Sequence, residues 1–207
     1  MRFYEKHYKA DDRFEEIYYK MFFDGGGKVL DIGCSTGNFA VQDKKNIIGV
    51  DLDEDQIKIA KSRGLNAIKF DANKKLPFKD NTFDKVNCRH VIEHLDDMSD
   101  NLLRFIREIR RVLKKNGKLV LITPDLRRVK FEFWHGYVHK HPFIKESLQK
   151  LAYDAGFDKI KVYNFVQGFP GMRFLYERGL ITIPLIKKIE RIAGRVYGNI
   201  LVLEAYK

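Results

Sequence analysis

Two glycines and one acid in the first quarter of the chain have the types and spacing of a ligand site. Gly33 and Gly37 lie in a predicted turn between a short apolar run and a more polar stretch. Because glycine has no side chain, a ligand can approach the backbone closely at such a turn. Asp51 ends the next apolar run, near the spacing of about 20 residues at which a carboxylate meets ribose hydroxyls. The combination predicts a bound nucleoside.

The same turn has two competing interpretations. Gly33-x-Ser35-x-Gly37 also spells the nucleophile elbow of α/β-hydrolases, with Ser35 as the nucleophile. That elbow follows a later strand, whereas this turn follows the first predicted strand. A dinucleotide oxidoreductase would need glycine in place of Ser35, where a pyrophosphate demands the closest backbone approach. A nucleoside ligand without a pyrophosphate tolerates the serine, so that interpretation is retained.

Short apolar runs alternate with amphipathic stretches from Lys28 onward, which is typical of βαβ units. We expect a mainly parallel sheet with helices on both faces. The predicted strands cover residues 28–32, 46–50, 66–70, 83–88, 118–123, 159–165 and 195–206. The predicted helices cover residues 37–42, 53–63, 98–115 and 145–156, with Asp53 as a cap and Gly64 as the stop of the second.

The length of 207 residues fits a single domain, 1–207, with one sizeable core. Residues 1–24 precede the first strand and are predicted to form a helical cap over the site. Residues 166–194 form an insertion between the last two predicted strands. Hairpin loops usually have two to five residues, so this insertion is predicted to have its own helical structure.

The net charge of +11 is concentrated in the second half, where 15 Lys and Arg follow Leu126 against seven acids. Such a field attracts nucleic acid, an anionic lipid surface or a phosphorylated substrate, although a lysine-rich solvated surface explains it equally well. No apolar run reaches the roughly 18 residues of a membrane span, and the N-terminus does not resemble a secretory signal. We expect a cytoplasmic protein in which Cys34 and Cys88 are structural.

The motifs taken in order resemble those of a known family. Residues 31–37, Asp-Ile-Gly-Cys-Ser-Thr-Gly, look like motif I of class I S-adenosylmethionine-dependent methyltransferases. Residues 48–51 resemble the second motif, residues 70–72 the adenine-contacting turn, and residues 83–95 the segment after strand four in the type 11 subgroup. The helix-to-strand corner at 113–119 also matches. The similarity covers residues 28–125, and more weakly residues 140–157.

This resemblance implies an α/β fold: a Rossmann-like three-layer sandwich whose mainly parallel seven-stranded sheet has an antiparallel last strand. It also implies S-adenosylmethionine as the cofactor. Asp31 would orient the methionine amino group, and Gly33 and Gly37 would admit the methionyl and ribose portion. Asp51 would accept the ribose hydroxyls, and Asp71 the adenine amino group. The predicted cofactor set is completed by Ser35, Leu52, Ala72 and Arg89.

Methyl transfer to a hydroxyl needs a base, and histidine titrates in the useful range. His94 follows the fourth predicted strand, and His139 and His141 lie with His135 after the fifth. His94, His139 and His141 are therefore the candidate catalytic residues. His94 has the alternative of packing and capping locally. The histidine spacing lacks a nearby carboxylate or cysteine partner, so no metal site is predicted.

The acceptor is predicted to be a small-molecule or lipid-like compound, because the insertion is rich in aromatic and aliphatic residues. Its segment 184–193 forms a basic amphipathic helix with Leu185, Ile189 and Ile192 on one face and Lys187 directed away from it. Such a helix can lie on an anionic membrane or cover a substrate pocket, but it is more often a lid packed on the core. The basic second half leaves RNA methylation as an alternative, and a non-catalytic cofactor-binding partner subunit is another.

Overall fold

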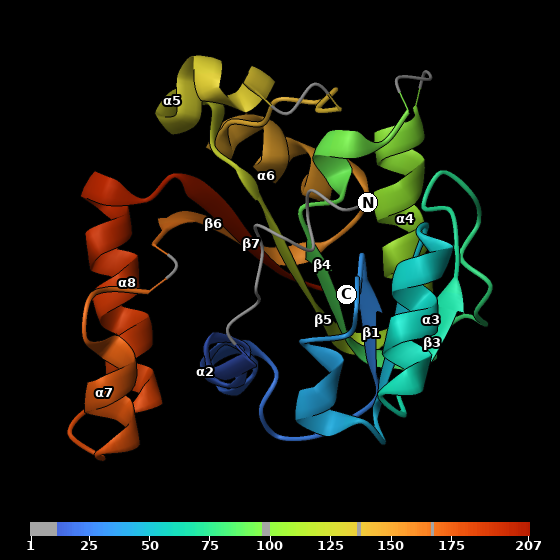
Figure 1. Ribbon diagram of the computed structural model, residues 1–207. Coiled ribbons are helices and arrows are strands. Elements are labelled where there is room, and N and C mark those ends of the chain that lie inside the picture. Colours follow the sequence, from blue (N-terminus) through green and yellow to red (C-terminus); the bar gives the residue numbers. More distant parts are fainter. Residues whose placement is uncertain (1–11, 97–99, 136–137, 167) are drawn as a thin grey trace.

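A seven-stranded sheet forms the centre of the computed structural model, which describes residues 12–96, 100–135, 138–166 and 168–207 (Figure 1). The strand order is β3-β2-β1-β4-β5-β7-β6. The strands are β1 (Val29–Ile32), β2 (Ile47–Asp51), β3 (Asn66–Lys69), β4 (Phe83–Arg89), β5 (Leu113–Pro124), β6 (Asp158–Phe165) and β7 (Ile200–Tyr206). Neighbouring strands among β1 to β5 pair in parallel, whereas β7 is antiparallel to both β5 and β6. The predicted fold class is confirmed.

Both faces of the sheet are buried, which explains why its strands read as continuous apolar runs. Successive side chains of a strand point to opposite faces, so Leu119 and Leu121 of β5 join one core cluster while Val120 and Ile122 join the other. Helices α4 (Asn101–Val112) and α6 (Lys145–Asp154) cover the first face. The second is covered by α2 (Asp12–Phe22), α3 (Glu54–Ser62) and α8 (Ile183–Tyr197).

The caps of α3 follow the sequence signals. The carboxylate of Asp53 accepts hydrogen bonds from the backbone N–H groups of Asp55 and Gln56, at 2.9 and 3.2 Å. Gly64 follows the helix with a φ of +76°, a conformation that favours glycine. Local chemistry therefore fixes both ends of α3, and with them the position of the loop that follows β2.

Two predicted boundaries on either side of α3 are wrong. The helix expected at 37–42 is a single 3-10 turn, η1 (Ala40–Asp43), because Phe39 turns into the core beside Tyr18 and Phe23. The helix expected to end at Lys115 ends at Val112, because Leu113 already pairs with Phe83 as a strand residue. Its expected start at Met98 lies outside the described residues.

The last predicted strand began too early. Residues 195–197 belong to α8, and β7 begins at Ile200. The reason is a close approach between α8 and β6, since a Cβ on Gly194 would lie 2.3 Å from the carbonyl oxygen of Asn164. Gly198 then ends the helix with its N–H bonded to the carbonyl of Gly194 at 3.0 Å.

The orientation of α8 also differs from the expected one, in which the helix is a lid whose apolar stripe packs on the core. Leu185 and Ile192 of that stripe are exposed, and Ile189 is partly buried. The buried side instead holds Ile186, Glu190 and Gly194. Lys187, which was expected to lie away from the apolar stripe, is on the inner side of the helix, 3.3 Å from Glu204 of β7.

Short elements complete the chain. They are η2 (Ile92–His94), α5 (Leu126–Val129), η3 (Lys130–His135) and α7 (Met172–Glu177). No helix among the described residues is long and apolar enough to cross a membrane. Residues 1–11 of the expected N-terminal cap lie outside the described part, and α2 accounts for most of the remainder.

Candidate active site at the carboxyl ends of the strands

The first turn of the site is built by backbone contacts between β1 and β2. The N–H groups of Gly33 and Cys34 both donate to the carbonyl of Val50, at 2.8 and 3.1 Å. Gly33 has a φ of +76°, and a Cβ there would lie 2.5 Å from the side chain of Val91. Only glycine fits this position, which lines a cavity at the carboxyl ends of the strands.

Asp51 connects the two loops that flank this cavity. Its Oδ2 accepts from the N–H of Ser35 at 2.8 Å, and its Oδ1 accepts from the N–H of Asp53 at 2.9 Å. Ser35 has a φ of +51°, where a glycine is more common, and this bond helps to hold it there. Asp51 and Leu52 both line the cavity. Asp51, the acid predicted to meet ribose hydroxyls, therefore lies on this cavity at the carboxyl end of β2.

Gly37 has a different surrounding from the one expected. It is absent from the cavity lining, and a Cβ on it would lie 2.1 Å from Leu65 and 3.5 Å from Ala60. Its φ of +84° also favours glycine. Gly37 therefore permits Ala60 of α3 and Leu65, which precedes β3, to pack against the turn.

Asp31 is buried at the end of β1 beside Asn87 of β4. Its Oδ1 accepts from the amide of Asn87 at 2.7 Å, and that amide oxygen accepts from the hydroxyl of Tyr18 at 2.9 Å. Its Oδ2 is buried without a hydrogen-bond partner. Burial raises the pKa of Asp31 to about 7, against the opposing effects of the Arg89 guanidinium and the Asn87 hydrogen bond.

Arg89 is engaged with α2 and is absent from the cavity lining. Its guanidinium lies 2.8 Å from the carboxylate of Glu15 and stacks over the ring of Tyr18 at 4.4 Å. The side chains of Arg89 and Glu15 are mostly buried. This ion pair joins α2 to the end of β4 close to Asp31. In the structure Arg89 therefore holds α2 against the sheet.

Asp71 and Ala72 line the cavity from the loop after β3. The Oδ1 of Asp71 accepts from the backbone N–H and the side-chain amide of Asn73, at 2.9 and 3.0 Å. Asn73 in turn accepts from the N–H of Asp96 and the amide of Asn101. Asp71 thus holds the turn in shape while its side chain borders the cavity, so the turn-cap and ligand interpretations are compatible.

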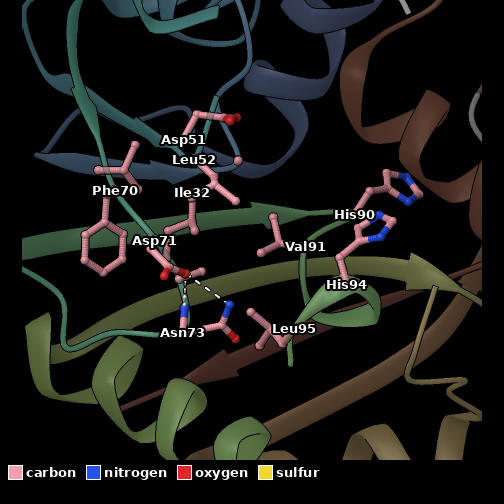
Figure 2. A pocket seen from close by; sticks show the side chains of 13 residues that line it. Ile32, Asp51, Leu52, Phe70, Asp71, Asn73, His90, Val91, His94 and Leu95 are labelled. Atoms are coloured by element: carbon pink, nitrogen blue, oxygen red, sulfur yellow. Dashed lines mark hydrogen bonds between the residues drawn. The ribbon is translucent and has the colours of Figure 1, made fainter. Parts of the chain in front are cut away.

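The cavity has a volume of about 240 Å³. Figure 2 shows Phe70 and Asp71 on one side and His90 and His94 on the other, with Val91 and Leu95 between. Of the predicted cofactor residues, it brings together Gly33, Asp51, Leu52, Asp71 and Ala72. Asp31, Ser35, Gly37 and Arg89 lie outside its lining. Asp31 directly precedes the lining residues Ile32 and Gly33, and Ser35 donates to the lining residue Asp51.

His90 was not singled out in the sequence, yet among the histidines that the structure describes it is the one with a carboxylate partner. Its Nδ1 lies 3.1 Å from Oε1 of Glu93, which is fully buried and whose Oε2 accepts from the hydroxyl of Thr123 at 3.2 Å. His90 has a φ of +53°, uncommon for a residue with a side chain. The sequence offered one signal, the spacing of three between His90 and Glu93.

The predicted catalytic histidines are held by backbone carbonyls. The ring of His94 packs against that of His139 at a tilt of 50°, with 4.8 Å between centroids, and burial lowers the pKa of His94. Nδ1 of His139 lies 2.6 Å from the carbonyl of Phe133, and Nε2 of His141 lies 3.1 Å from that of Leu95. The structure brings His94 and His139 together, and only His94 of the three lines the cavity.

Comparisons with known proteins agree with this arrangement. A family model described as a methyltransferase domain matches residues 30–121. An uncharacterized protein of Methanocaldococcus jannaschii is 30% identical over 78% of this chain and 83% of its own length. The crystal structure of a SAM-dependent methyltransferase from Archaeoglobus fulgidus superimposes with a TM-score of 0.72 and 25% identity, over 100% of this chain and 98% of that chain. The chain belongs to the class I S-adenosylmethionine-dependent methyltransferases.

Relatives of this methyltransferase differ in length and in named acceptor. The chain spans 61% of another M. jannaschii protein that is 33% identical over 78% of this chain. A demethylmenaquinone methyltransferase of Staphylococcus saprophyticus is 26% identical, over 79% of this chain and 84% of that protein. A probable tRNA methyltransferase 9B of Homo sapiens is 35% identical, but over 46% of this chain and 21% of that protein.

The family's cofactor is S-adenosylmethionine, and the residues of the site fit it. The buried Oδ2 of Asp31 has no hydrogen-bond partner, which is the arrangement expected where a ligand supplies a donor. The turn at Gly33 leaves no room for a side chain, and the carboxylate of Asp51 stands on the same cavity. Two carboxylates, those of Asp31 and Asp51, thus lie at the carboxyl ends of neighbouring strands, and they are of the type that binds an ammonium group and ribose hydroxyls.

Substitution of two neighbouring acids, Asp51 and Asp53, distinguishes an effect on cofactor binding from an effect on the cap of α3. For Asp51→Ala we expect the affinity for S-adenosylhomocysteine to fall by roughly ten- to a hundredfold, the value of a lost hydrogen bond to a charged group. For the matched control Asp53→Ala, we expect a loss of about 1 kcal/mol in unfolding free energy with unchanged affinity. Calorimetric titration and chemical denaturation measure the two quantities. An equal loss of affinity in both variants would contradict the assignment of Asp51.

Proposed function

We propose that this chain transfers the methyl group of S-adenosylmethionine to a small-molecule or lipid-like acceptor in the cytoplasm. The observation that carries the proposal is that one and the same cavity is bordered by Gly33, Asp51 and Asp71 on the cofactor side and by His90 and His94 on the other. Two buried, free cysteines, Cys34 and Cys88, are consistent with a reducing compartment.

The cofactor side follows the strand ends. Asp31 would receive the methionine amino group at its free Oδ2, and Asp51 would accept the ribose hydroxyls. Asp71 and Ala72 would border the adenine, with Leu52 against its ring. The bound cofactor supplies an electrophilic methyl group on a sulfonium, so the protein's task is to position the acceptor in line and to exclude water. Gly37 and Arg89 contribute through packing rather than through direct contact.

We assign the general base to His90 in preference to the three histidines expected from sequence. A base is most effective when a third group orients it, and buried Glu93 holds Nδ1 of His90 in that way. This leaves Nε2 of His90 for the acceptor at the edge of the cavity. His139 and His141 each have a ring nitrogen bonded to a backbone carbonyl and do not line the cavity. Glu93 is a positioning residue.

An apolar acceptor suits the wall beside these histidines, which carries Ile32, Val91 and Leu95. The similarity to a demethylmenaquinone methyltransferase over most of both chains supports the same class of acceptor. RNA is the alternative, supported by the positive second half and by the shorter match to a probable tRNA methyltransferase. The wall favours the apolar compound, because nucleic acid recognition relies on basic and polar contacts.

Transfer of a labelled methyl group into a cell extract tests the proposed function. After incubation with labelled S-adenosylmethionine, we expect the label to partition into the organic-soluble or small-molecule fraction in amounts above those of an Asp51→Ala control. Label that is released by nuclease would replace the proposed acceptor by RNA. Thermal stabilisation by the cofactor without labelled product in any fraction would identify a non-catalytic cofactor-binding subunit.

Cofactor affinity should depend on pH through Asp31. The carboxyl of the free protein has a pKa raised to about 7, while a bound ammonium group favours its ionised form. We expect affinity to fall about tenfold per pH unit as the pH drops below this value, and to be flat above it. Asp31→Asn should bind weakly and without this dependence. Calorimetric titration across the range decides, and a wild-type affinity independent of pH would contradict the role of Asp31.

Substitution of His90 tests the base. With the acceptor identified by labelling, we expect His90→Ala to lower kcat by about a hundredfold to ten-thousandfold, with cofactor affinity retained. Glu93→Gln should lower kcat by less and leave KM unchanged, since it keeps the shape of the contact but loses the charge. Steady-state kinetics of the His94, His139 and His141 alanine variants provide the comparison. A large loss in one of those alone would move the base to that residue.

A further inference from the structure

The outward face of α8 combines exposed aliphatic and basic side chains. Leu185, Ile192 and Val196 follow one another at helical spacings of seven and four, so they share one face. Their exposed fractions are 45%, 55% and 62%. Lys188 and Arg195 are also exposed and border this stripe. We define these five side chains as the α8 outer face.

The inner side of the same helix is packed against the core. Ile186 is fully buried there, and Oε1 of Glu190 accepts from the N–H of Gly168 at 2.8 Å, while the buried Oε2 has no hydrogen-bond partner. Lys187 contacts Glu204, and Gly194 packs on the backbone of β6. Rotation of the helix to bury the outer stripe would break these contacts. The apolar residues of the outer face therefore cannot be buried in the core while the present inner contacts of α8 are kept.

A second exposed segment adjoins the end of α8. Arg128 of α5 donates to the carbonyls of Arg195 and Val196, at 2.7 and 2.9 Å, which ties α5 to the last turn of the helix. Figure 1 shows α5 near this end of α8. The following turn η3 exposes 86% of Phe131 and 52% of Trp134, beside the exposed side chains of Lys130 and Glu132. A second group of exposed aromatic and charged side chains therefore adjoins the end of α8.

We infer that the α8 outer face, together with η3, binds the surface of an anionic membrane. Aliphatic side chains enter the headgroup boundary of a bilayer, while lysine and arginine beside them attract anionic lipid. Tryptophan is enriched at the membrane interface for the same reason. Within α8 the only acid is Glu190, which is buried, so no carboxylate of the helix opposes this attraction.

The chemistry distinguishes this partner from nucleic acid. A surface for RNA would present basic and polar groups to phosphate, with aromatic rings for base stacking. Leu185, Ile192 and Val196 have no role in such a contact, whereas burial of aliphatic groups drives adsorption to a bilayer. The inference is independent of the proposed acceptor, because vesicle binding requires neither cofactor nor turnover.

Vesicle co-sedimentation tests the inference. The full chain is mixed with vesicles of phosphatidylcholine alone or with added phosphatidylglycerol. We expect binding to the mixed vesicles only, and a loss on addition of salt. Lys188→Gln with Arg195→Gln should weaken binding about twenty-five-fold, since each basic residue near an anionic surface contributes a factor of about five. Leu185→Ser with Ile192→Ser and Val196→Ser should also abolish detectable pelleting.

The controls separate surface chemistry from folding. Lys115→Gln with Tyr153→Ser removes one exposed charge and one exposed apolar side chain outside α8 and η3, and should leave binding unchanged. Thermal unfolding and S-adenosylhomocysteine binding of all variants should match the parent chain. Equal binding to neutral and anionic vesicles, or unchanged binding by the α8 variants, would overturn the inference. Binding to tRNA that the α8 charge variant abolishes, without vesicle binding, would assign the face to nucleic acid.

Discussion

The buried carboxylate of Asp31 is the constraint on which the rest of the site depends. In the register of the sheet it lies between Gly49 of β2 and Asn87 of β4, at the centre of the molecule. An ionised carboxylate buried without a full set of partners costs several kcal/mol. One oxygen is bonded to Asn87 and the other is without a partner, so the fold tolerates this cost only because neighbouring groups compensate in part. Such local conflicts are typical of functional sites.

The compensation comes from elements that are distant in sequence. Tyr18 of α2 donates to Asn87, and Arg89, paired with Glu15 of the same helix, places positive charge near Asp31. This helix therefore does two things at once: it covers one face of the sheet and it completes the polar surroundings of the carboxylate. A change in α2 should thus affect cofactor binding through Asp31, although the helix does not supply the motif residues themselves.

Much of the fold was predictable because its signals are local. Short apolar runs between amphipathic stretches predicted the sheet, the Asp53 cap and Gly64 predicted α3, and Gly33 marked the turn at which β1 ends. The failures depend on contacts between distant segments. Gly194 reads as an ordinary helix breaker, yet it lies against Asn164 and lets α8 continue. The surroundings of Gly37 are equally hidden in the sequence, since a Cβ there would lie 2.1 Å from Leu65.

The acceptor side was the least predictable part for the same reason. His94, His139 and His141 have suitable chemistry, but their positions follow from how residues 138–141 pack along residues 93–95. The sequence pattern of α8 is equally ambiguous, since a basic amphipathic helix can turn either side to the core. Two charged residues decide the matter: Glu190 and Lys187 find partners inside, at Gly168 and Glu204. Because these contacts hold the inner face of α8 against the sheet, the aliphatic stripe is left outside, and its exposure has to be explained by something beyond the chain's own core.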